Sequence, residues 1–221
     1  MVFLAILIVL PLGMITLQVV LDLDALLGLW GYSLYKVFFI VPPLIYCRRH
    51  GVGILSDICK FRHWRRCLPL ALGLGGLAMV LFAGVYALLG DRLVDKELIA
   101  VKIGEQFKVS SATVLLIAPV TILANSLLEE FFYRGFAFGL LVRKNRRLGY
   151  LVPAVAFTGQ HLLFIYHWLT PFPLALAVGG LFLLALVLQR IYEKADSLVA
   201  PWIIHILGDV AMMGIAVTLL R

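Results

Sequence analysis

Two adjacent glutamates and an arginine interrupt the apolar sequence LLEEFFYRGF. Glu130 and Arg134 are four residues apart, so on a helix they share a face and can form an ion pair. Glu129 is turned by about 100° from Glu130 on a helix of about 3.6 residues per turn, and it therefore needs a different partner. Because ionisable groups at membrane depth are costly and usually functional, we expect one carboxylate to be structural and the other to be paired elsewhere in a functional site.

Two histidines lie inside other apolar stretches, each with a partner one helical turn away. His161 follows Phe157 by four residues in AFTGQHLLFIYHW, and His205 precedes Asp209 by four residues in APWIIHILGDV. The Asp209 carboxylate can therefore hydrogen-bond to the His205 ring and orient it. Taken singly, each histidine also fits a hydrogen-bonded packing residue, and the His205–Asp209 pair fits a contact that only stabilises a helix bundle.

These ionisable residues are more informative together than singly. Of the twelve acidic residues of the chain, only Glu129, Glu130 and Asp209 lie deep inside an apolar stretch, and of its five histidines only His161 and His205 do. Carboxylates and imidazoles drawn from three helices are the composition of an acid–base or metal site. The three stretches therefore predict one shared site.

The elements that must position this site are membrane helices. Hydrophobic residues make up 63% of the 221-residue chain and charged residues only 14%, with a mean hydropathy of +1.04, whereas soluble domains average about 45–50% apolar and about 25% charged. This composition excludes a large soluble domain, a disordered chain and a nucleic-acid-binding protein, despite the net charge of +7. We expect residues 1–221 to form a single transmembrane domain of an integral, multi-pass protein in the inner or plasma membrane, or in the ER membrane of a eukaryote.

Seven apolar stretches can be distinguished, and most have the length of about 20 residues that one helical crossing needs. They are continuously apolar rather than alternating, which favours helices over the strands of a β-barrel. The sequence thus predicts an all-α fold, a polytopic transmembrane helix bundle of about seven spans with room for an eighth helix. The stretches are 2–21, 25–47, 67–90, 111–142, 149–168, 172–189 and 198–220.

The lysines and arginines predict the orientation of these spans. Twelve of them fall in the segments 48–66, 143–147 and 190–197. Because cytoplasmic loops carry an excess of basic residues, we expect these segments and the N-terminus in the cytoplasm, where the basic edges would contact anionic lipid headgroups. In the segment 91–110 four acidic residues balance four basic ones, and this segment is expected to be an external loop.

The stretch that carries the two glutamates is longer than a membrane is thick. As a straight helix, residues 111–142 would extend about 48 Å, against a hydrocarbon core of about 30 Å. The stretch must therefore tilt, protrude or break, and Gly135 is the expected point of flexibility. A tilt or a break there would also bring His205, which is near the start of its stretch, level with the deeper Glu129 and His161.

The three motifs, in this order, resemble the CAAX protease and bacteriocin-processing (CPBP, or Abi) family of intramembrane peptidases, which includes the type II CAAX prenyl endopeptidases. The signature of the family is EExxxR on one helix, FxxxH on a second, and HxxxN or a related polar residue on a third. This chain matches it with EEFFYR, FTGQH and HILGD. The resemblance covers about residues 111–212, which we expect to be the catalytic core helices.

The resemblance implies a role for each matched residue. Glu129 would activate a water molecule, and His161 would share that water. His205 would stabilise the developing oxyanion or help to hold the water. The residues that brace the site would be Glu130, Arg134 and Phe157.

Asp209 stands where the prenyl-protein members of the family have Asn. An ionised Asp cannot donate a hydrogen bond to an oxyanion as Asn does, so Asp209 is expected to orient His205 or to bind a metal ion. Glu129, His161 and His205 could supply three ligands to zinc, with water as the fourth. Because the chain has no HExxH motif, we favour metal-free catalysis by the glutamate, with no required cofactor and with zinc as the alternative.

The resemblance and the chemistry together predict an intramembrane endopeptidase that hydrolyses a peptide bond of a membrane-associated or lipidated peptide or protein. Its partners would be membrane lipids and a substrate that is prenylated or, in a host without prenylation, a leader peptide or pheromone precursor. Nucleic acid is not an expected partner. The buried acids and histidines also fit a proton-coupled transporter, and a non-catalytic immunity or scaffold protein of the membrane is the third alternative.

Overall fold

The structure is a computed structural model that describes Gly13 and residues 36–107 and 109–221. The regular elements in these residues are all helices, apart from one isolated bridge between Phe61 and Ser197. The all-α prediction is therefore confirmed. With η for a π-helical segment, the helices are α4 (Val37–His50), η1 (Ile54–Cys59), α5 (Trp64–Leu93), α6 (Lys96–Phe107), α7 (Ser111–Pro119), η2 (Val120–Asn125), α8 (Ser126–Glu130), η3 (Phe131–Phe138), α9 (Gly139–Leu141), α10 (Arg146–Ile165), α11 (Pro171–Ala195) and α12 (Val199–Leu219).

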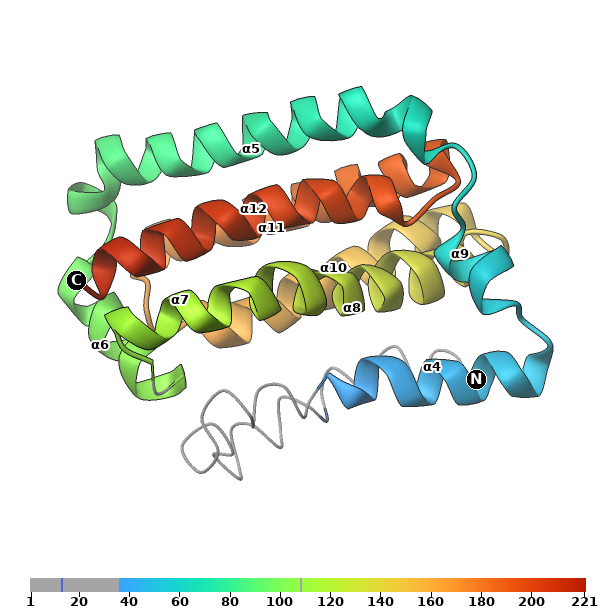
Figure 1. The fold of residues 1–221 in the computed structure, drawn as a ribbon, viewed down its shortest axis with the longest axis horizontal. Coiled ribbons are helices and arrows are strands. Elements are labelled where there is room, and N and C mark those ends of the chain that lie inside the picture. The colour runs from blue at the N-terminus through green and yellow to red at the C-terminus, as the bar shows by residue number, and fades with distance from the viewer. Residues whose placement is uncertain (1–12, 14–35, 108) are drawn as a thin grey trace.

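The long helices lie side by side with their axes nearly parallel (Figure 1). α5 packs on α12, α12 also contacts α11 and α8, and α10 packs on α11 and η3. α4 lies on the opposite side of the bundle from α5 and contacts α8 and η3. Because α8 and η3 between them touch α4, α10 and α12, the segment that carries Glu129 and Glu130 lies at the centre of the bundle.

Four helices of the described part of the chain are long and apolar enough to cross a membrane. They are Trp64–Leu93, Ala112–Leu141, Pro171–Ala195 and Val199–Leu219. Large apolar side chains are exposed on their outer faces, as on α5, where Leu88 is 82% exposed. Such a surface suits lipid rather than water, so these helices indicate a multi-pass membrane protein. Of the seven stretches predicted as spans, 2–21 lies outside the described residues except for Gly13, and 25–47 is described only in part, as Lys36 and most of α4.

The segment 91–110, expected to be a loop, is mostly helical. α5 runs into it and α6 occupies most of it. Asp95 Oδ1 accepts a hydrogen bond from the Leu98 N–H (2.9 Å) and caps α6, while Ser110 and Thr113 form a capping box at the start of α7. The loop was predicted from the balanced charge of the segment, and because charge balance does not indicate secondary structure, α6 was missed. The external position of the segment stays a prediction.

The helix that carries the glutamates does not break at Gly135. It is helical from Ser111 to Leu141, with wider π-helical turns in η2 and η3. A Cβ atom placed on Gly135 would lie 2.5 Å from Cγ2 of Ile58 and 3.2 Å from the Ile58 carbonyl oxygen. The glycine therefore lets η1 pack directly on η3, so the expected point of flexibility is instead a site of close packing.

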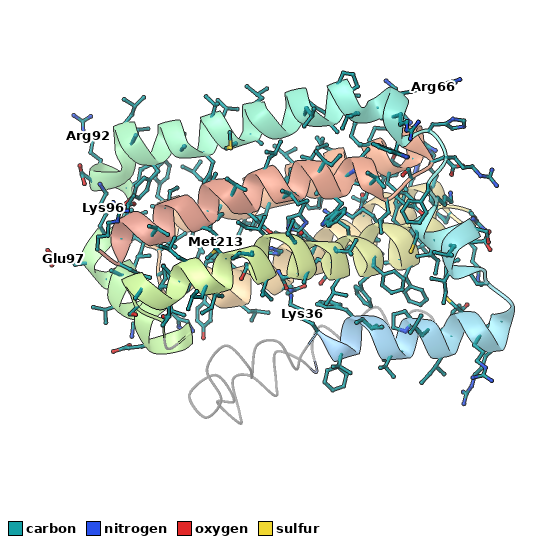
Figure 2. All side chains as sticks on the ribbon, viewed as in Figure 1. Lys36, Arg66, Arg92, Lys96, Glu97 and Met213 are labelled. Atoms are coloured by element: carbon teal, nitrogen blue, oxygen red, sulfur yellow. The ribbon has the colours of Figure 1, made fainter. Side chains whose placement is uncertain are left out.

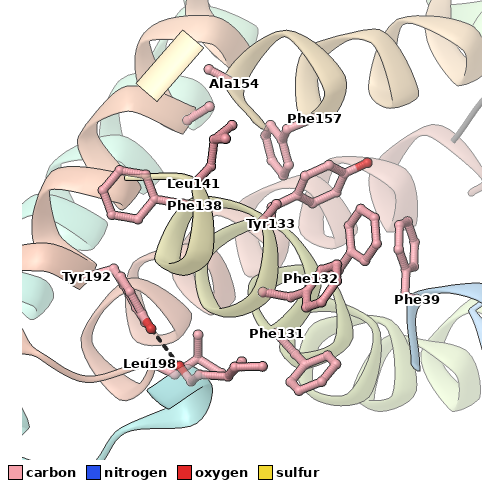
Figure 3. Packing of buried hydrophobic residues seen from close by; sticks show 14 of the residues in the cluster. Phe39, Phe131, Phe132, Tyr133, Phe138, Leu141, Ala154, Phe157, Tyr192 and Leu198 are labelled. Atoms are coloured by element: carbon pink, nitrogen blue, oxygen red, sulfur yellow. Dashed lines mark hydrogen bonds between the residues drawn. The ribbon is translucent and has the colours of Figure 1, made fainter. Parts of the chain in front are cut away.

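Aromatic rings form the core around η3 (Figure 3). Phe132 packs on Phe39 of α4 with ring centroids 4.7 Å apart, and Tyr133 packs edge-on against Phe157 of α10 at 5.3 Å. Tyr192 of α11 donates a hydrogen bond of 2.6 Å to a backbone carbonyl of η1. These contacts hold α4, α10 and α11 against the central helix, next to the two glutamates.

Candidate active site

α8 places both glutamates inside the bundle, and the Glu130 side chain is fully buried. Oε1 of Glu130 lies 2.9 Å from Nη1 of Arg134, in the ion pair that their spacing indicates. The guanidinium also lies over the Phe157 ring, 4.2 Å from its centroid, in a cation–π contact. The pair balances two buried charges and ties η3 to α10, which is a bracing arrangement.

The second contact of Glu130 is with His205 on α12. Nδ1 of the imidazole lies 2.7 Å from Glu130 Oε1, and because an ionised carboxylate only accepts, Nδ1 is the donor. Nε2 lies 3.6 Å from Asp209 Oδ1, which is beyond hydrogen-bond length. The hydrogen bond that orients His205 thus comes from Glu130 and not from Asp209, because the packing of α12 on α8 turns the ring toward the neighbouring helix.

The two oxygens of Glu129 have different surroundings. Oε1 lies 2.6 Å from Nζ of Lys36. The same oxygen accepts hydrogen bonds from Asn125 Nδ2 (3.1 Å) and Gln160 Nε2 (3.3 Å). Oε2 is also buried, but it accepts no hydrogen bond from any residue that the structure describes. One oxygen is therefore saturated with donors, while the other is left for a further partner.

The unpaired oxygen of Glu129 faces two imidazoles. It lies 3.6 Å from Nε2 of His161 and 3.9 Å from Nε2 of His205. Nδ1 of His161 lies 2.9 Å from the carbonyl oxygen of Phe157 and must donate to it, so in the neutral ring Nε2 is an acceptor. The three atoms are too far apart to hydrogen-bond with one another, and they leave a common place for a water molecule or an ion.

The donor set also fits a metal ion. Glu129, His161 and His205 offer one carboxylate oxygen and two ring nitrogens that all lie within 4.8 Å of one another. An oxygen and two imidazole nitrogens, with one position open for water, are the ligands of many catalytic zinc sites. Asp209 lies beside this group, and its buried Oδ2 accepts no hydrogen bond within the described residues.

Three residues of the site were not singled out from the sequence: Lys36, Asn125 and Gln160. Lys36 stands where α4 begins, on the side of the central helix (Figure 2). It carries the same signal as Glu129, a charge inside an apolar stretch, and could have been found by it. Gln160 links Glu129 to Tyr133, whose hydroxyl donates to the Gln160 amide oxygen. Neutral amides carry no comparable signal in a single sequence.

A comparison with known protein families gives a match to the central and C-terminal helices of the chain. Residues 111–211 match the profile of the type II CAAX prenyl endopeptidase Rce1-like family. No curated protein and no solved structure gives a match to the chain. The matched segment runs from α7 into α12 and contains all of the site residues except Lys36.

The helical fold and this match define the class of the protein, which is a peptidase with membrane helices. Residues 111–211 form an Rce1-like type II CAAX prenyl endopeptidase domain of the CPBP family. The resemblance found on the three motifs is therefore confirmed, and with it the expectation of a peptidase.

Proposed function

We propose that the protein is an intramembrane endopeptidase in which Glu129 activates the water that hydrolyses a peptide bond. The observation that carries this proposal is the asymmetry of the Glu129 carboxylate. Its Oε1 is held by Lys36 at 2.6 Å, whereas its Oε2 is unpaired among the described residues and faces His161 and His205. A carboxylate oxygen in this position is a general base aimed at the place where a water molecule completes the site.

In the proposed reaction, Glu129 Oε2 takes one proton from the water as the water oxygen bonds to the scissile carbonyl carbon. Nε2 of His161 or of His205 accepts a hydrogen bond from the second hydrogen, which fixes the direction of attack. The proton on Glu129 then passes to the amine nitrogen as the C–N bond breaks, leaving a carboxylate and a free amine. Glu130 and Arg134 keep His205 in place without entering the chemistry.

The same residues accommodate a zinc-dependent form of the reaction. A zinc ion, when bound, would be held by Glu129, His161 and His205 and would supply positive charge near the substrate carbonyl oxygen. Asp209, with Oδ1 at 3.6 Å from Nε2 of His205, would stabilise that ring whenever it carries a second proton. This role suits an aspartate better than the asparagine of the prenyl-protein members.

We also propose about seven membrane spans with the N-terminus in the cytoplasm. The three basic segments meet at one end of the bundle, where Lys60 lies 2.6 Å from Asp196 and Arg143 lies 3.5 Å from Asp57. Arg92 lies at the other end (Figure 2). Basic residues gathered at one end support a cytoplasmic position for that end, and the substrate would reach the site from this side.

The proposed substrate is a membrane-associated or lipidated peptide or protein. Because the family match is to prenyl endopeptidases, a prenylated C-terminal peptide is the first substrate to test. Unprenylated leader peptides and pheromone precursors are the second class.

Glu129→Gln is expected to lower the rate of peptide cleavage by about 10²- to 10⁴-fold, because an amide cannot take the proton from water. Purified protein in detergent is given a library of farnesylated C-terminal peptides and unprenylated leader peptides, with and without a chelator, and products are followed by mass spectrometry. Glu97→Gln, which changes an exposed glutamate on α6, is the matched control and should cleave as the wild type does.

A Glu129→Gln variant that cleaved at the wild-type rate would show that Glu129 is not the base. Loss of wild-type cleavage on adding the chelator, restored by zinc, would select the metal-dependent form. No cleavage by the wild type, together with proton flux in proteoliposomes, would replace the peptidase with a transporter.

A further inference from the structure

Lys36 lies immediately before α4, outside the segment matched to the family, yet its side chain reaches the proposed base. Its Nζ is 2.6 Å from Glu129 Oε1, and the two side chains are only 5% and 2% exposed. The ammonium also lies 5.0 Å from the centre of the Phe39 ring, in a cation–π contact on its own helix. A buried charge from α4 is therefore held against the central carboxylate of the site.

The ammonium makes the two oxygens of Glu129 inequivalent. The terminal torsion of a glutamate is broad and roughly two-fold, so rotation would otherwise exchange Oε1 and Oε2 easily. Lys36 is the charged member of the three donors to Oε1, the others being amides, and a charge-assisted hydrogen bond is stronger than a neutral one. With Lys36 in place, Oε2 is the oxygen that remains on the histidine side.

We propose that Lys36 is a positioning residue for the hydrolytic reaction. By binding Oε1 of Glu129, it leaves Oε2 as the one oxygen presented to the water or metal ion beside His161 and His205. This inference rests on the proposed function, in which Glu129 is the base. It adds that α4, and not only the family-matched domain, contributes to the site.

Lys36 also has a structural role, because a buried Glu129 without its cation would be strongly destabilised. A methionine at position 36 could occupy similar space and pack on Phe39. It could neither balance the Glu129 charge nor hold one particular oxygen of that carboxylate. The lost charge balance would lower the folded fraction, whereas the lost alignment would lower kcat per folded molecule.

The test measures kcat and KM for Lys36→Met on the library peptide that the wild type cleaves fastest. We expect kcat to fall about 10- to 100-fold, since a misplacement of about 1 Å near reacting groups costs about that much. KM should change by less than about twofold, because the proposed role of Lys36 is to position Glu129 and not to bind the substrate. Lys36→Arg, which keeps the charge, should recover part of kcat. Lys96→Met removes an equally short ion pair, with Asp91 at 2.6 Å, and should leave both constants unchanged.

Thermal unfolding in detergent gives the folded fraction of each variant, so that kcat is counted per folded molecule. If Lys36→Met does not fold, Lys36→Gln, which keeps a donor without its charge, takes its place with the same expectation. A wild-type kcat per folded molecule would overturn the inference, because Lys36 would then be structural only. An inactive Glu129→Gln beside a fully active Lys36 variant would refute the positioning role alone, whereas an active Glu129→Gln would refute the proposed function itself.

Discussion

Among the single residues of the site, Glu130 connects the Arg134 guanidinium to the His205 ring. Its Oε1 lies 2.9 Å from the Arg134 guanidinium and 2.7 Å from His205 Nδ1. Glu129 lies beside it in the chain but pairs with Lys36 on another helix. The two adjacent carboxylates thus have separate cations. Glu130 orients the His205 ring, and in the proposed mechanism Glu129 presents to it the oxygen that has no hydrogen-bond partner among the described residues.

Glu130→Gln is expected to lower the free energy of unfolding by roughly 3 kcal/mol, because it leaves Arg134 buried without its counter-ion. The amide oxygen of the new residue can still accept from His205 Nδ1, so kcat per folded molecule should fall far less than in Glu129→Gln. Unfolding by denaturant in detergent, together with cleavage assays, checks both expectations. Glu105→Gln changes an exposed ion pair and should cost less than about 1 kcal/mol. Equal stability of these two variants would contradict the bracing role.

Among the helices, contacts within one helix could be predicted from the sequence, and contacts between helices could not. The spacing of Glu130 and Arg134 gives the right pair because both lie on one helix, whose geometry sets their distance. The His205 ring hydrogen-bonds to Glu130 rather than to Asp209 on its own helix. Lys36 contacts Glu129, from which it is separated by 93 positions in the sequence. Both contacts depend on how each helix is rotated about its axis in the bundle, and hydrophobic spacing of a single chain does not determine that rotation.

Helices with a long apolar stretch were predicted closely, and polar ones were missed. The apolar stretch 67–90 corresponds to the helix Trp64–Leu93, and the stretch 198–220 corresponds to the helix Val199–Leu219. α6 and η1 were not expected, since each lies in a charged segment without a continuous apolar run. η1 nevertheless matters for the site, because it packs against the helix that carries the glutamates.

Gly135→Ala is expected to lower the free energy of unfolding by about 1–3 kcal/mol, because its Cβ would overlap a methyl group of Ile58 and push η1 away from η3. In a chain that already carries Ile58→Ala, the same glycine change should cost less, because the shorter side chain makes room for that Cβ. Gly179→Ala is the matched control: a Cβ on this α11 glycine meets nothing within 4 Å, so the change should be neutral or stabilising by up to about 1 kcal/mol. Unfolding in detergent measures all three, and equal effects of the two glycine changes would contradict the close contact.

Across the whole molecule, the site lies nearer to the basic end of the bundle. Glu129 is twelve residues from the end of the candidate span Ala112–Leu141, or about 18 Å at about 1.5 Å per residue. At that end the loops before α5, before α10 and after α11 are joined by ion pairs such as Lys60–Asp196 and Arg143–Asp57. If this end faces the cytoplasm, a substrate that enters there meets Glu129 before it has crossed the membrane.

The proposed orientation predicts opposite labelling of the two ends. In a chain with Cys47, Cys59 and Cys67 changed to Ala, a membrane-impermeant maleimide should label Arg92→Cys in sealed, right-side-out vesicles, and Arg147→Cys only after permeabilisation. Both arginines are exposed in the structure, so burial within the protein does not limit the reaction. Labelling of Arg147→Cys from outside would invert the orientation, and the substrate would then have to reach Glu129 from the exterior, where prenylated cytoplasmic proteins are not present.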